Sequence, residues 1–138
     1  MSFVVDCSVA ARWLLPDEAT PYTEAAFGLL TEQDAVIPVL FLSEFANVFL
    51  KLVRQRKLAR EIGFGAVQRF SALGLEVDRS TPDPERIFTL ADQYGLSAYD
   101  ATYLELALRR GIHLACWDGG LKAAAQTAGL YLDATSRT

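Results

Sequence analysis

Short apolar runs alternate with longer amphipathic segments along this chain, and that alternation restricts its fold more than any other feature. The runs at residues 3–5, 35–37, 74–77 and 113–116 are brief and flanked by turn residues, as expected of buried strands. The segments between them carry the polar and apolar spacing of helices. Strands that alternate with helices form a parallel sheet with helices on both faces. We therefore expect an α/β fold with a mostly parallel central sheet.

Proline and glycine mark the ends of the expected helices. These span residues 8–15, 22–32, 40–57, 61–73, 84–94, 97–110 and 121–128, and a last short strand is expected at 130–132. The chain has 138 residues, of which 51% are hydrophobic, and no linker, repeat or low-complexity segment interrupts it. This predicts a single domain over residues 1–138 with one core.

Several classes of protein do not fit this sequence. The N-terminus lacks a basic leader followed by an apolar segment, and the longest apolar stretch, residues 35–42, is too short to span a bilayer. We expect a soluble, cytoplasmic protein without a membrane partner. Cys7 and Cys116 are the only cysteines and His113 is the only histidine, which is too few for a disulfide framework or a zinc cluster. Both thiols are expected to be reduced core residues.

Four carboxylates lie where a strand ends or where a helix carries a narrow polar stripe. Asp6 and Asp118 each follow a predicted strand, Glu44 lies on the polar stripe of the long helix at 40–57, and Asp100 lies in the first turn of another helix. Ligands of open α/β sheets bind outside the carboxyl ends of the strands, so these acids could converge on one site. A ligand set of oxygens alone selects Mg²⁺ or Mn²⁺.

Each acid also has a purely structural interpretation. Asp6 and Asp118 could cap helices or stabilise turns, Glu44 could belong to a solvated helix face, and Asp100 stands three residues after Ser97 as in a capping box. One shared site explains all four acids together, whereas the structural reading needs four separate coincidences.

Basic residues are concentrated in one stretch although the net charge of the chain is −4. Such a concentration can form a surface that binds the phosphates of a nucleic acid, or simply the solvated end of a helix. Arg12 is a further candidate phosphate contact, with a surface ion pair to Glu18 as the alternative. The concentrated basic residues are Lys51, Arg54, Arg56, Lys57 and Arg60.

Metal-assisted hydrolysis of a phosphodiester suits the acids better than histidine chemistry. His113 lies inside a predicted strand, where a structural role is the more common one. One or two hard cations can supply an activated water, a neutralised phosphate and a stabilised leaving oxygen. Asp6, Asp100 and Asp118 are the expected metal ligands, with Glu44 acting directly or through water and Ser8 orienting a carboxylate or a water.

Four motifs, taken in order, resemble those of PIN-domain ribonucleases and in particular the VapC toxins. They are Val4 to Ala10, Glu44 with Asn47, the block Leu96 to Tyr103, and Ala115 to Asp118. The resemblance implies a three-layer α/β/α sandwich in which Asp6, Glu44, Asp100 and Asp118 hold Mg²⁺ or Mn²⁺ and Ser8 assists Asp6. It further implies an endoribonuclease toxin of a type II toxin–antitoxin system, typically dimeric and inhibited by a cognate antitoxin. Cys116 departs from the Thr or Ser that the family often has at this position.

A non-catalytic interaction protein with the same fold is the alternative, because it would share every apolar position with the enzyme. A receiver domain and a haloacid-dehalogenase phosphatase fit less well. The receiver domain needs a strand-end lysine, which is not found, and the phosphatase needs a second aspartate where Ser8 stands.

Apolar residues at 41–58, with Ile62, Phe64 and Phe70, are expected to form an exposed patch that supports a homodimer. Trp13 is expected in the core and Trp117 under a neighbouring helix.

Overall fold

The computed structural model describes residues 1–117 and 119–135 and shows one parallel sheet at the centre of the molecule. Strands β1 (Ser2–Val5), β2 (Asp34–Pro38), β3 (Glu76–Asp78) and β4 (His113–Ala115) lie in the order β3-β2-β1-β4, and all three pairings are parallel. The predicted strands at 3–5, 35–37, 74–77 and 113–116 are confirmed with small shifts in their ends.

The prediction of a strand at residues 130–132 is wrong. Only one isolated parallel bridge, between Leu114 and Tyr131, forms there. Leu114 donates to the Leu130 carbonyl and accepts from the Leu132 amide, and the chain then enters a turn at residues 134–135. This segment therefore touches β4 at a single residue and is too short to extend the sheet.

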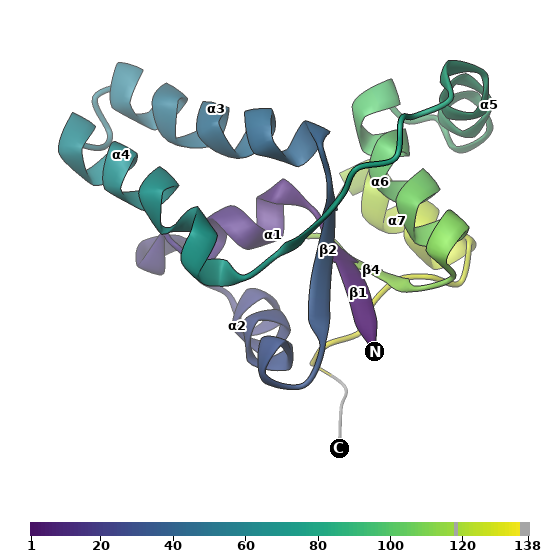
Figure 1. Ribbon diagram of the computed structural model, residues 1–138, viewed down its shortest axis with the longest axis horizontal. Helices are drawn as coiled ribbons and strands as arrows, with labels where there is room; N and C mark the ends of the chain where they lie inside the picture. The colour runs from purple at the N-terminus through teal and green to yellow at the C-terminus, as the bar shows by residue number, and fades with distance from the viewer. Residues whose placement is uncertain (118, 136–138) are drawn as a thin grey trace.

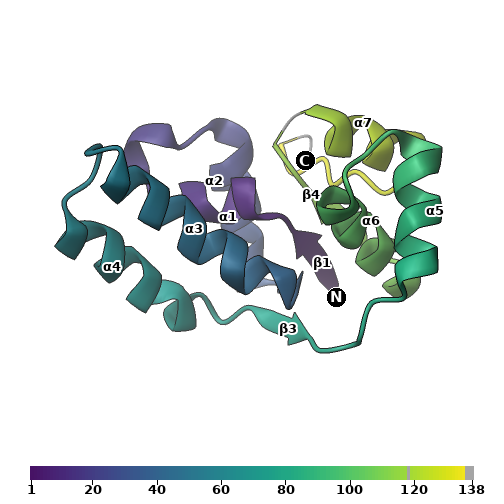
Figure 2. The same cartoon turned by 90° about the horizontal axis from the view of Figure 1, so that it is seen from above.

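Helices cover both faces of the sheet and form the outer two layers (Figure 1). Helices α1 to α4 lie on one side, and α5 to α7 lie on the other, as the view from above also shows (Figure 2). The expected three-layer α/β/α sandwich is thus confirmed. The helices are α1 (Cys7–Arg12), α2 (Pro21–Gly28), α3 (Leu40–Arg54), α4 (Arg60–Gln68), α5 (Pro84–Tyr94), α6 (Ala98–Arg110) and α7 (Gly119–Thr127), with short 3-10 turns at Pro16–Glu18, Leu29–Thr31 and Arg69–Leu73.

Among the described residues, 1–117 and 119–135, no helix is long and apolar enough to cross a lipid bilayer.

Several predicted helices were too long at their C-terminal ends. The segments at 22–32 and 61–73 finish as 3-10 turns, and α1 ends at Arg12 rather than Leu15. Helix α3 ends at Arg54 because Arg56 adopts a left-handed conformation with φ 59°. The amides of Arg56 and Lys57 then bond the carbonyls of Val53 and Leu52, a closing pattern that terminates helices.

Helix α3 packs one face into the core and leaves another exposed. Phe41, Phe45 and Phe49 recur every four residues and are at most 2% exposed. The predicted apolar patch is therefore only partly correct, since these phenylalanines are internal while other members are exposed. The exposed apolar residues of α3 and α4 are Leu42, Leu50, Ile62 and Phe64.

The carboxyl ends of β1 and β4 lie side by side. Val5 is in register with Ala115, and the Asp6 amide donates to the Ala115 carbonyl at 3.0 Å. Helix α6 packs against β1, β2 and β4, while α3 packs against β2 and α1. Residues that leave the sheet at this edge therefore emerge between the two helical layers (Figure 2).

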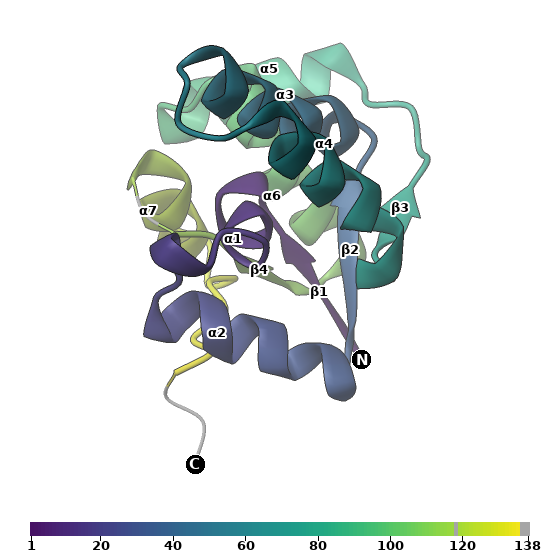
Figure 3. The same cartoon turned by 90° about the vertical axis from the view of Figure 1, so that its left-hand side faces the viewer.

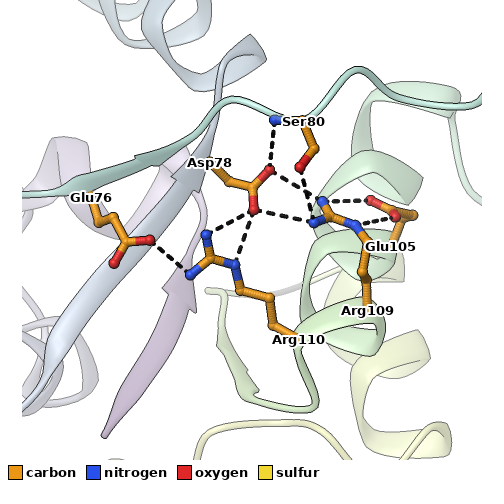
Figure 4. Close-up of polar contacts among 6 residues, drawn as sticks. All are labelled: Glu76, Asp78, Ser80, Glu105, Arg109 and Arg110. Carbon is orange, nitrogen blue, oxygen red and sulfur yellow. Dashed lines mark hydrogen bonds and ion pairs between the residues drawn. The ribbon is translucent and has the colours of Figure 1, made fainter.

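A network of charged side chains ties the C-terminal half of α6 to β3 (Figure 4). Asp78, only 5% exposed, accepts from Arg109 at 3.2 Å and from Arg110 at 2.9 Å. Arg109 also pairs with Glu105 at 2.7 Å, and Arg110 pairs with Glu76 at 2.7 Å. Burial alone would raise the pKa of Asp78, but the hydrogen bonds it accepts outweigh burial and hold its pKa well below the usual range.

Replacing this buried carboxylate should destabilise the fold. Asp78→Asn leaves two guanidinium groups without their buried anion, so we expect a loss of about 2 to 3 kcal/mol in the free energy of unfolding at pH 7. Because the folded-state pKa is lowered, the stabilisation is present above pH 4 and fades as pH falls further. Urea unfolding at several pH values measures this loss.

Glu76→Gln is the matched control, because it breaks a pair in which Glu76 is 49% exposed and Arg110 is 31% exposed. Solvent screens such a pair, so the control should lose less than about 1 kcal/mol. Equal losses in the two variants would show that Asp78 is not the anchor of the network.

Candidate active site

Asp6 follows β1 directly and is the N-cap of α1. Its Oδ1 accepts from the Ser8 hydroxyl at 2.7 Å and from the Val9 amide at 3.1 Å. The capping interpretation of Asp6 is therefore correct, and it is compatible with a functional one because both bonds end on the same oxygen. Ser8 orients the Asp6 carboxylate, one of the two roles predicted for it.

Glu44 projects from the second turn of α3 and is held from across the sheet. Tyr103, on α6 and 2% exposed, donates its hydroxyl to Glu44 Oε1 at 2.5 Å. Burial raises the pKa of Glu44, the bond from Tyr103 lowers it in part, and the negative charge of Asp100 raises it again. Glu44 thus faces the interior between the layers rather than open water.

Asp100 lies in the first turn of α6, which Ser97 caps. The Asp100 amide donates to Ser97 Oγ at 3.1 Å, so the predicted cap is present. The cap uses the backbone of Asp100 and the side chain of Ser97, which leaves the Asp100 carboxylate outside this interaction. Burial raises the pKa of that carboxylate.

The pKa of Asp6 shows that these three acids share one environment. Burial raises it from 3.8 to about 6, although the bonds from Ser8 and Val9 oppose the rise. The negative charges of Asp100 and Glu44 also raise it, by less than burial does. Three acids from separate parts of the chain, Asp6, Glu44 and Asp100, are therefore within electrostatic range of one another. Ser8 is bonded directly to Asp6.

The fourth predicted acid, Asp118, lies outside the residues that the structure describes. Within residues 1–117 and 119–135, no three His, Cys, Asp or Glu side chains are arranged as a ready metal site. The chemistry of the donors still fits a divalent cation, because three partly buried carboxylates that repel one another are stabilised by a hard positive ion.

Arg12 and Trp117 stand beside this acidic cluster. Arg12 donates from Nη1 to the Ser8 carbonyl at 2.7 Å, and its guanidinium carbon lies 5.2 Å from the centre of the Trp117 ring. Arg12 therefore contacts the helix turn that carries Ser8 and an aromatic face, and not the predicted alternative partner Glu18. Trp117 is partly buried, packs against the hydrophobic core and also faces Arg12, and its predicted place under a neighbouring helix stays a prediction.

The predicted RNA-binding residues Lys51, Arg54 and Lys57 are not next to the acids. Lys51 and Arg54 lie in the last turn of α3, and a rise of about 1.5 Å per residue separates Arg54 from Glu44 by roughly 15 Å. Lys57 follows the helix and lines a separate hollow of about 370 Å³ beside Trp13. Their role in RNA binding remains a prediction.

Tyr103 is the site residue whose role the sequence did not reveal. It lies three residues after Asp100, and this spacing places it on the same face of α6. That spacing is the feature of the sequence from which a place in the site could have been predicted. Its partner Glu44 is 59 residues away in the chain, so only the fold identifies the contact. The two cysteines are buried, as expected, at 8% and 0% exposure.

Removing the Asp6 charge should stabilise the metal-free protein at neutral pH. A raised folded-state pKa means that the native state binds the proton more tightly, so stability falls as pH rises from about 4 through 6. Asp6→Asn keeps an oxygen acceptor for Ser8 and Val9 but no charge. We expect it to gain about 1 to 3 kcal/mol at pH 7.5, with the gain disappearing near pH 4.

Chemical denaturation with EDTA present measures the effect, and Asp83→Asn is the matched control. Asp83 is also an N-cap acid, exposed at the start of α5, and Asn caps helices as well as Asp does. The control should change stability little at either pH. A loss of stability in Asp6→Asn at pH 7.5 would contradict the electrostatic account.

Comparison with solved structures gives related folds over most of the chain. The protein PAE2754 from Pyrobaculum aerophilum superposes with a TM-score of 0.69 at 19% identity, over 90% of this chain and 79% of its own. VapBC2 from Rickettsia felis, bound to a DNA fragment from its promoter, superposes with a TM-score of 0.61 at 16% identity, over 86% of this chain and 88% of its own. VapC20 from Mycobacterium tuberculosis, a toxin that cleaves the sarcin-ricin loop, superposes with a TM-score of 0.58 at 18% identity, over 88% of this chain and 94% of its own.

Comparison with curated protein sequences gave no match. The family model of the PIN domain matches residues 3–126, a range that contains all four predicted acids. This match covers most of the chain, and the parallel sheet with helices on both faces agrees with it. The chain belongs to the PIN domain family.

Proposed function

We propose that this protein is a metal-dependent endoribonuclease that acts as the toxin of a type II toxin–antitoxin system. The observation that carries the proposal is the cluster of Asp6, Glu44 and Asp100, whose mutual repulsion contributes to the raised pKa of Asp6. Membership of the PIN domain family supports it, and so does the likeness of fold to VapBC2 and to VapC20.

In this proposal Asp6, Asp100 and Asp118 hold Mg²⁺ or Mn²⁺, and Glu44 acts directly or through a water. A bound divalent cation would supply an activated water and a neutralised phosphate for hydrolysis. The protein's own part is to fix the carboxylates before substrate arrives. Ser8 fixes Asp6 through Oδ1, and Tyr103 fixes Glu44 through Oε1.

Cys116 stands where the family often has Thr or Ser, and its side chain is fully buried. A thiol is a weaker hydrogen-bonding partner than a hydroxyl for water or for a carboxylate. We therefore propose that support for the last acid from this position is weaker here than in relatives with a hydroxyl.

The proposed partners are RNA, a cognate antitoxin and a second copy of the chain. Exposed apolar side chains on α3 and α4 support protein partners, and they line a hollow of about 510 Å³ between the two helices with Leu50 and Phe64 among its walls. A toxin that cleaves cellular RNA would act in the cytoplasm.

A non-catalytic PIN-fold protein that binds RNA or a protein partner is the alternative proposal. It would keep the sheet and the helices but would not need carboxylates placed together at a cost in stability. The acidic cluster therefore favours the enzyme.

Divalent metal should stabilise the folded protein through the acidic cluster. Binding to the native state alone raises stability by mass action, about 2.7 kcal/mol when the free metal is one hundred times its dissociation constant. Millimolar Mn²⁺ should therefore raise the melting temperature of the wild-type protein by several degrees. A thermal-shift titration with and without EDTA measures it.

Asp100→Asn should fold but lose most of the rise in melting temperature that Mn²⁺ causes. The control Asp83→Asn, which changes an exposed helix cap elsewhere, should show the same rise as the wild type. If Mn²⁺ shifted Asp100→Asn as much as the wild type, the acids would not be the metal site.

RNA cleavage should depend separately on the acids and on the basic end of α3. Asp6→Asn should abolish metal-dependent cleavage of single-stranded RNA. Arg54→Glu with Lys57→Glu should weaken RNA binding most at low salt, because these side chains would act on the phosphate backbone and not on the metal. Gel-based cleavage and filter binding at several salt concentrations measure both effects.

Arg86→Glu, which reverses an exposed charge on α5, is the control for the double variant. If the double variant bound and cleaved RNA normally at every ionic strength, the basic residues would have no role in RNA binding and would simply form the solvated end of a helix. Full cleavage by Asp6→Asn would instead favour the non-catalytic alternative, with a contaminating nuclease as the source of activity.

A further inference from the structure

A polar hollow of about 400 Å³ has Trp117 as one of its lining residues. Its other lining residues come from α7, from the start of α2 and from the segment after α7. Figure 3 shows the course of these backbone segments. Three of the residues that line it are aromatic, Tyr22, Trp117 and Tyr131, and Lys122 and Gln126 of α7 complete the wall with Asp133. Aromatic rings, a cation, an amide and one exposed carboxylate, that of Asp133, therefore surround one space.

The aromatic wall is held in place by contacts of its own. Tyr131 stacks on Tyr22 with ring centres 5.6 Å apart and planes inclined by 9°. Tyr22 is buried and donates its hydroxyl to the Leu132 carbonyl at 2.7 Å. Lys122 Nζ lies 5.3 Å from the centre of the Tyr131 ring. These contacts fix the positions of Tyr131 and Lys122 in the wall of the hollow.

A chain of contacts connects this hollow to the acidic cluster. Trp117 lines the hollow and also stacks with Arg12 at 5.2 Å. Arg12 bonds the Ser8 carbonyl at 2.7 Å, and Ser8 bonds Asp6 at 2.7 Å. The hollow is therefore joined to the Asp6 carboxylate by neighbouring side chains and stands next to the strand end that leads to Asp118.

The chemistry of the hollow distinguishes it from the larger one between α5, α6 and the start of α3. That one measures about 650 Å³ and its walls include the exposed rings of Phe88 and Tyr99, with prolines beside them, as suits an apolar partner. The hollow at Trp117 instead combines aromatic faces with Lys122 and, at its edge, Arg12. Proteins bind single-stranded nucleic acid with this combination, stacking bases on rings and pairing phosphates with cations.

We propose that the hollow at Trp117 is a subsite for one nucleotide of single-stranded RNA, next to the phosphate that is cleaved. The base stacks on the Trp117 ring, and the phosphates contact Lys122 and Arg12. The inference rests on RNA being the substrate in the proposed function, and it places the specificity of that reaction on the α7 side of the acids.

Tryptophan fluorescence tests the subsite without cleavage. The chain has two tryptophans, Trp13 and Trp117, so Trp13→Phe leaves Trp117 as the only indole. In an Asp6→Asn background with EDTA, hexauridylate should quench this emission to saturation. Lys122→Ala should raise the dissociation constant about tenfold, and Arg86→Ala, an equal loss of charge on α5, should leave it unchanged. Linear polyphosphate of similar charge should bind about tenfold more weakly than hexauridylate, because it has no base to stack.

If Trp13→Phe does not fold, the protein with both tryptophans and its Trp117→Phe variant give the same information, since quenching should be lost only in the latter. Quenching that is absent, or that is equally sensitive to Lys122→Ala and Arg86→Ala, would overturn the subsite, and equal affinity for polyphosphate would overturn the base contact. Cleavage by the wild-type protein with Mn²⁺ is measured in parallel. Cleavage without these binding effects rejects the subsite alone, whereas binding with the predicted effects but no cleavage supports the subsite and rejects the ribonuclease.

Discussion

The hydrogen bond from the Asp6 amide to the Ala115 carbonyl fixes the point on which the whole site depends. It continues the pairing of β1 with β4 for one residue beyond Val5, so the chain leaves both strands at the same edge of the sheet. Asp6 must then turn into α1, and its own carboxylate caps that helix. One residue therefore ends a strand, starts a helix and presents an acid between the two helical layers. A shift of β4 by one residue would separate these roles.

Helix α6 supplies the other half of the site because it is held at two places. In its second turn, Tyr103 bonds Glu44 of α3, which joins the two helical layers across the edge of the sheet. Near its end, Arg109 and Arg110 pair with Asp78 at the end of β3. The two attachments fix both the rotation and the axial position of the helix, and Asp100 in its first turn inherits that placement. The ion pairs therefore act on the site through the helix and not through contact with it.

The sequence predicts the parts of this site that depend on neighbours along the chain. Asp6 follows an apolar run and Ser97 precedes a helix, so a strand end and a cap could be read from a few adjacent residues. Asp78 and Tyr103 carry no comparable signal, because their partners are 31 and 59 residues away. The overlong prediction for the helix at 40–57 has a similar cause. Arg56 is not a residue type that favours a left-handed conformation, so its residue type does not predict the end of α3 at Arg54.

The raised pKa values of Asp6, Glu44 and Asp100 show that the fold places charge where it is unfavourable. Burial is the largest cause in all three acids, and Asp6 receives two hydrogen bonds that only partly offset it. A carboxylate that served only to cap a helix would be more stable at the surface, as Asp83 is at the start of α5. In a site that binds a cation, buried carboxylates lower the stability of the empty protein, and the bound ion removes their repulsion. The comparison of Asp6 with Asp83, two caps of the same residue type, therefore shows that capping alone does not explain the burial of Asp6, and this supports the proposed cation site.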